Sequence, residues 1–139
     1  MRFWDSSALI PLILEQPHSP RARAFLDDDP DGVIWWGTPV ECASAFARLR
    51  REGRLSPDEE VEASQLVESL RLAWHEVQPG DGLRLQALRV LRLHQLRAGD
   101  ALQLAAALEW GGGPPTGEFL TFDERLGMAA KLEGFSVVG

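Results

Sequence analysis

Four acidic residues, Asp5, Glu41, Asp100 and Asp123, stand where a predicted strand passes into a helix or where a predicted helix begins. A single carboxylate at such a place is common, because the N–H groups and the dipole of a helix N-terminus favour negative charge. Four of them, brought together by a fold, would instead form a site with oxygen ligands only. Hard divalent cations such as Mg²⁺ and Mn²⁺ prefer such ligands, and the chemistry expected there is phosphodiester hydrolysis.

Each acid also has a purely structural interpretation. Glu41 follows Thr38 by three residues, the spacing of a capping box. Asp123 would serve as a plain N-cap. Asp100 is harder to explain in this way. It stands beside Gly99 at the head of an Ala/Leu-rich helix, where a buried charge is costly unless something positive faces it.

Alternating strand and helix patterns position these acids. Thr38 before Pro39 and Ser56 before Pro57 predict two N-caps, and Ser6 or Ser7 is expected to cap the first helix. Strands are predicted at 2–4, 33–36, 75–77, 118–121 and 135–138, and helices at about 6–15, 21–26, 38–52, 57–72, 83–91, 100–110 and 123–132.

Strands separated by helices are typical of a parallel sheet that helices cover on both faces. We therefore predict an α/β fold, a three-layer α/β/α domain with a central, mainly parallel sheet of about five strands. Residues 1–139 are expected to form a single domain. Trp35, Trp36, Trp74 and the leucines of 83–96 are predicted to lie in the core, and residues 111–115 are predicted to form a loop.

Composition narrows the class of protein. The 139 residues carry a formal net charge of −7, which disfavours a general basic surface for nucleic acid. Four of those charges belong to the acids above, and bound divalent ions would offset them. The single cysteine, Cys42, fits a reducing cytosol. The early apolar stretch 8–14 is too short for a secretory signal or a membrane span, so we expect a cytoplasmic protein.

Four segments together resemble one family. They are FWDSSAL at 3–9, TPVE at 38–41, LRAGDALQLAAA at 96–107 and FLTFDERL at 119–126. The chain resembles PIN-domain ribonucleases, and is most similar to the VapC-type toxins of prokaryotic toxin–antitoxin pairs. The resemblance covers the whole chain in the right order, and the segment around Asp100 is its most specific part.

The resemblance implies an RNA endonuclease that depends on Mg²⁺ or Mn²⁺. Asp5 and Asp100 would be the principal metal ligands and Glu41 and Asp123 would complete the pocket, with Asp123 acting directly or through water. Ser6 would orient Asp5. The resemblance further implies a homodimer and a cognate antitoxin protein whose tail would obstruct the acidic pocket.

Two other classes of protein remain as alternatives. One is a PIN-like module that binds RNA or protein without catalysis; the presence of all four acids counts against it. The other is a phosphorylatable receiver domain. That class would need an aspartate at the end of the middle strand and a lysine after a late strand, whereas Gln78 and Pro79 follow Val77 and the only lysine, Lys131, lies in the last predicted helix.

Overall fold

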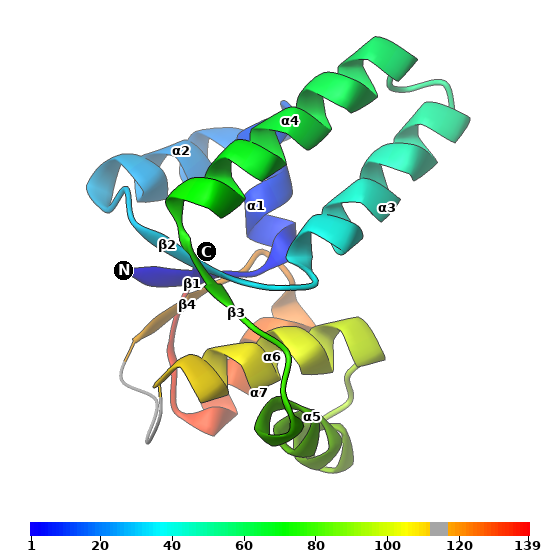
Figure 1. Ribbon diagram of the computed structural model, residues 1–139. Coiled ribbons are helices and arrows are strands. Elements are labelled where there is room, and N and C mark those ends of the chain that lie inside the picture. The colour runs from blue at the N-terminus through cyan, green and yellow to red at the C-terminus, as the bar shows by residue number, and fades with distance from the viewer. Residues whose placement is uncertain (112–116) are drawn as a thin grey trace.

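The computed structural model of the protein describes residues 1–111 and 117–139, and these residues form a five-stranded parallel sheet between two layers of helices (Figure 1). The sheet has the order β3-β2-β1-β4-β5. The elements are β1 (Arg2–Trp4), α1 (Ser6–Ile13), α2 (Ser19–Asp28), β2 (Gly32–Trp35), α3 (Thr38–Arg51), α4 (Pro57–Ala73), β3 (His75–Val77), α5 (Asp81–Leu93), α6 (Ala98–Gly111), β4 (Glu118–Leu120), α7 (Glu124–Glu133) and β5 (Ser136–Val138).

The predicted fold class is confirmed, because every pair of neighbouring strands is parallel. In the centre of the sheet Phe3 of β1 is in register with Val33 of β2 and with Phe119 of β4. Parallel strands end at the same edge of a sheet. The residues that follow β1, β2 and β4 are therefore carried to one edge, where ligands bind in folds of this type.

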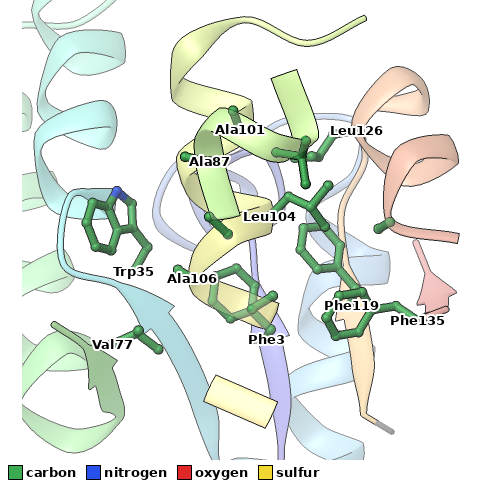
Figure 2. Packing of buried hydrophobic residues seen from close by; sticks show 14 of the residues in the cluster. Phe3, Trp35, Val77, Ala87, Ala101, Leu104, Ala106, Phe119, Leu126 and Phe135 are labelled. Atoms are coloured by element: carbon green, nitrogen blue, oxygen red, sulfur yellow. The ribbon is translucent and has the colours of Figure 1, made fainter. Parts of the chain in front are cut away.

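Alternate residues of the central strands supply two separate cores. Phe3 and Phe119 stack with ring centroids 5.3 Å apart and face the layer of α5, α6 and α7 (Figure 2). Their neighbours Trp4 and Leu120 face the layer of α1 to α4. This alternation follows from the two-residue period of a strand, and burial on both faces explains why the central strands β1, β2 and β4 are mostly apolar.

Several local predictions need correction. Asp5 itself, rather than Ser6 or Ser7, is the N-cap of α1, since its carboxylate accepts a hydrogen bond from the Ser7 N–H. The N-cap of α3 is Gly37, and Thr38 is already helical. The cap predicted at Ser56 is confirmed as a full capping box with Glu59.

The predicted core is only partly correct. Trp35 is buried but Trp36 is half exposed. In the leucine-rich helix α5, Leu83 faces the core, whereas Leu85 and Leu88 are exposed because they lie on the outer face. The predicted loop at 111–115 lies outside the described residues apart from Gly111, which ends α6. Among the described residues no helix is both long and apolar enough to cross a membrane.

Candidate active site

Asp5 directly follows β1 and is almost fully buried, with 2% of its surface exposed. Its Oδ2 accepts hydrogen bonds from the Ser7 hydroxyl at 2.5 Å and the Thr121 hydroxyl at 2.8 Å, and a longer one of 3.3 Å from the Ser7 N–H. Its Oδ1 accepts only a long contact of 3.4 Å from the Ser6 hydroxyl. One oxygen is therefore fixed by the protein, and the other retains free lone pairs for a ligand.

Ser6 connects Asp5 to the second acid. Its hydroxyl donates to Glu41 Oε2 at 2.8 Å, a shorter hydrogen bond than its contact with Asp5. The predicted role of Ser6 in orienting Asp5 thus rests on the weaker of its two contacts. Ser7 and Thr121 hold Asp5 more directly, and Thr121 lies just after β4, the strand that neighbours β1.

Glu41 lies in the first turn of α3 and is held from the opposite side by Gln103 of α6. Gln103 is fully buried, and its Nε2 donates to Glu41 Oε1 at 3.1 Å and to the Thr38 hydroxyl at 3.0 Å. The structural interpretation of Glu41 as the capping-box partner of Thr38 is therefore wrong. Both residues instead face a buried amide from across the fold.

Asp100 occupies the first turn of α6, beside Glu41. A Cβ atom placed on Gly99 would lie 3.8 Å from the Glu41 carboxyl carbon, so the start of α6 approaches this carboxylate closely. Burial raises the pKa of Asp100 and the charge of Asp123 raises it further. Hydrogen bonding from the Arg97 backbone and the charges of Arg97 and Arg125 lower this pKa, but they do not outweigh the first two effects.

Asp123 is the N-cap of α7, as its structural interpretation required. Its Oδ1 accepts a hydrogen bond from the Leu126 N–H at 2.8 Å, and its own N–H donates to the Thr121 hydroxyl at 3.0 Å. Asp123 is exposed, unlike Asp5. Capping does not exclude a second role, because Oδ2 is not used by this hydrogen bond.

An open cleft of about 1150 Å³ joins three of the four acids. Glu41, Asp100 and Asp123 line it together with Arg97 and Arg125. Asp5 does not line this cleft, but it lies close to the other acids: its charge raises the pKa of Glu41, and the charge of Asp100 raises the pKa of Asp5. The structure thus gathers all four predicted residues in one region at the carboxyl edge of the sheet.

The donor set fits a hard divalent cation, although its ligand geometry is not complete. In the described part of the chain, no three acidic, histidine or cysteine side chains are arranged to hold a metal ion as they stand. Burial, as the largest cause, raises the pKa values of Asp5, Glu41 and Asp100, and their mutual repulsion adds to it. A cation would relieve this repulsion. The assignment of these acids as metal ligands stays a prediction.

Sequence reasoning missed Ser7, Thr121 and Gln103. A signal for Gln103 was available, because it is the only polar residue between Ala101 and Leu108 in a helix predicted to be buried, and a buried amide must find partners. The hydroxyls of Ser7 and Thr121 carried no comparable signal.

Comparison with known proteins identifies the fold family. The PIN domain matches residues 2–132, and the chain therefore belongs to the PIN-domain family. No curated protein sequence matches the chain significantly.

Solved structures resemble the chain over nearly its whole length. FitAcB from Neisseria gonorrhoeae is 17% identical with a TM-score of 0.70, covering 100% of this chain and 97% of that one. Mycobacterium tuberculosis VapC20, described as a sarcin-ricin loop cleaving toxin, is 17% identical with a TM-score of 0.69, covering 97% and 96%. A toxin–antitoxin complex from Klebsiella pneumoniae is 15% identical with a TM-score of 0.67, covering 100% and 97%. At these identities the likeness establishes the fold alone.

Proposed function

We propose that this PIN-domain protein, as one domain of residues 1–139, is a divalent-metal-dependent endoribonuclease and the toxin of a toxin–antitoxin pair. The observation that carries the proposal is that Ser6 donates to Glu41 at 2.8 Å while its hydroxyl lies 3.4 Å from Asp5 Oδ1, with Asp100 beside them. Carboxylates from three separate elements therefore lie together, and no lysine or arginine side chain takes part in these contacts.

The chain's own residues would prepare the site. Ser7 and Thr121 saturate Asp5 Oδ2 and leave Oδ1 free, while Gln103 and Ser6 fix both oxygens of Glu41. Asp5 and Asp100 would hold Mg²⁺ or Mn²⁺, and Glu41 and Asp123 would contact the ion directly or through water. The bound ion would supply activation of water and stabilisation of the charge that develops at phosphorus.

RNA cleavage assays with purified protein test the catalytic part of the proposal. Wild type should cleave RNA in magnesium, lose activity in chelator, and regain it with magnesium or manganese better than with zinc. Asp5→Asn and Asp100→Asn should each lower the rate more than about a hundredfold, because each removes a charged ligand with little change in volume.

Asp58→Asn is a matched control. Asp58 is an exposed acid in the first turn of α4, and its removal should leave cleavage unchanged. Activity of Asp5→Asn or Asp100→Asn within about tenfold of wild type would refute the catalytic assignment. A protein that binds RNA or a partner but never cleaves would instead be a non-catalytic PIN-like module.

The partners are part of the same proposal. Solved structures with this fold include a toxin–antitoxin complex and FitAB bound to a DNA fragment. We infer a cytoplasmic homodimer that binds a cognate antitoxin. Leu85, Leu88 and Leu93 on α5 are exposed, and they provide apolar surface of the kind that protein interfaces bury. Light scattering of the purified protein tests the dimer. Co-purification with the product of the adjacent reading frame tests the antitoxin.

A further inference from the structure

A second hollow, of about 550 Å³, lies next to the acidic cleft. The two share Asp123, Glu124 and Met128 as lining residues, so the hollow and the cleft adjoin at the start of α7. Its volume is within the range of pockets that bind small ligands or one unit of a polymer. None of the four acids except Asp123 lines it.

Aromatic and cationic side chains line this hollow. The imidazole of His18 lies parallel to the ring of Phe122, with centroids 4.3 Å apart and planes 4° apart. The Arg21 guanidinium lies 5.6 Å from the centroid of the same ring. Lys131 reaches the hollow from the last turn of α7. A stacked ring pair with flanking cations is suited to a base and its phosphate.

This grouping stands out against the rest of the chain. The protein has a formal net charge of −7 and only one lysine, yet that lysine lines a hollow with Arg21 and His18 directly beside the acids. Val137 and Val138 of β5 also line it and add apolar surface. His18 and Arg21 are exposed residues, so their contacts with Phe122 leave polar atoms accessible from solvent.

We propose that this hollow binds one nucleotide of single-stranded RNA next to the phosphodiester bond to be cleaved. The base packs against the His18–Phe122 pair, and a phosphate contacts Lys131 and Arg21. The inference rests on the proposed function and extends it by naming a substrate subsite outside the acidic cleft. Arg21 also donates to the Gly139 carbonyl oxygen at 2.7 Å, which fixes its position at the edge of the hollow.

Fluorescence anisotropy with a labelled RNA oligonucleotide tests the subsite, in an Asp5→Asn background that prevents cleavage. His18→Ala should weaken binding about 5- to 150-fold through lost stacking, and His18→Phe should restore it. Lys131→Gln should reduce the slope of log K against log salt concentration by about 0.7, the value for one phosphate contact of a single strand. Arg51→Gln, at the exposed far end of α3, is the matched control and should bind as the background does.

A series of oligonucleotides with one abasic position each identifies the base. At one position the abasic RNA should bind the background protein more weakly than the intact RNA does. The His18→Ala protein should bind that abasic RNA and the intact RNA equally, because its stacking contact is already gone. Equal binding by background, His18→Ala and Lys131→Gln would overturn the subsite, and RNA cleavage by wild type would then leave the proposed function standing. If wild type cleaves no RNA and the background binds none, the proposed function fails and the subsite with it.

Discussion

At the scale of single residues, Asp5 combines two roles that are usually separate. It caps α1 and, through the same Oδ2 atom, accepts the hydroxyls of Ser7 and Thr121. A buried carboxylate with donors on one oxygen is still costly to ionise. Burial therefore raises its pKa despite these hydrogen bonds, and the charge of Asp100 raises it further.

This raised pKa predicts how the metal-free protein responds to pH. The folded state holds the Asp5 proton more tightly than the unfolded state does, so the stabilising contribution is present at low pH and is lost as pH rises through the folded pKa. In chelator, the free energy of unfolding of wild type should fall relative to that of Asp5→Asn as the pH rises above the range in which an ordinary aspartate ionises. Urea denaturation of both proteins measures the difference. A wild-type free energy of unfolding that stays constant or rises relative to that of Asp5→Asn as the pH increases would contradict the prediction.

Gln103 is expected to control the position of Glu41. Gln103→Leu keeps the volume but removes the donor to Glu41 and Thr38, so we expect about 10- to 100-fold lower RNA cleavage, as for other residues that orient ligands. Stability should fall by about 1 to 3 kcal/mol because Thr38 loses a buried partner. Gln65→Leu, on the exposed face of α4, is the control for both measurements. Unchanged cleavage by Gln103→Leu would show that Glu41 needs no support from α6.

At the scale of elements, α4 provides a test of stability that is independent of the site. Ser56→Ala removes a capping box in which the Ser56 hydroxyl accepts from the Glu59 N–H at 3.1 Å. We expect a loss of about 0.5 to 2 kcal/mol and unchanged RNA cleavage, since α4 carries none of the four acids. Thermal denaturation of wild type, Ser56→Ala and Ser64→Ala measures the loss of stability, and Ser64→Ala is the control because Ser64 is exposed in the middle of the helix. An equal loss in both variants would mean that the cap contributes nothing.

The start of β2 depends on a glycine for a steric reason. A Cβ atom on Gly32 would come within 2.5 Å of the Trp74 ring, whose Nε1 donates to the Pro30 carbonyl oxygen at 3.0 Å. Gly32→Ala should therefore cost about 1 to 3 kcal/mol of stability through overpacking. The cost should shrink in a Trp74→Ala background, because the obstructing ring is gone. Additive losses in the double variant would assign the cost to the backbone of β2 instead.

At the scale of the whole molecule, metal binding should act on stability as well as on activity. Magnesium at about a hundred times its dissociation constant should stabilise wild type by about 2.7 kcal/mol, or several degrees in melting temperature. Asp100→Asn should be at least as stable as wild type in chelator, because it removes a repelling charge, and should lose most of the magnesium effect.

Thermal denaturation of both proteins, in chelator and in millimolar magnesium, decides the matter. No magnesium effect on wild type, or an Asp100→Asn variant several kcal/mol less stable in chelator, would make Asp100 a structural acid. The charges of Arg97 and Arg125 would then be its counterions, since both lower its pKa in the metal-free protein.

The sequence alone determined the order of strands and helices, the α/β class and the capping box at Ser56. These features depend on residues within a few positions of one another, where periodicity, prolines and capping side chains act directly. The sequence also placed Asp5, Glu41, Asp100 and Asp123 at the ends or starts of elements. From parallel strands alone it follows that acids after neighbouring strands share one edge of the sheet.

Only the tertiary structure decided what each carboxylate contacts. Thr121 binds Asp5 across 116 positions of the chain, and Gln103 binds Glu41 across 62. It also decided that Glu41 serves no capping box and that Trp36 and Leu85 lie outside the core. The physical reason is that a hydroxyl or amide has many possible partners, and only the packing of α6 and β4 against β1 and α3 selects one.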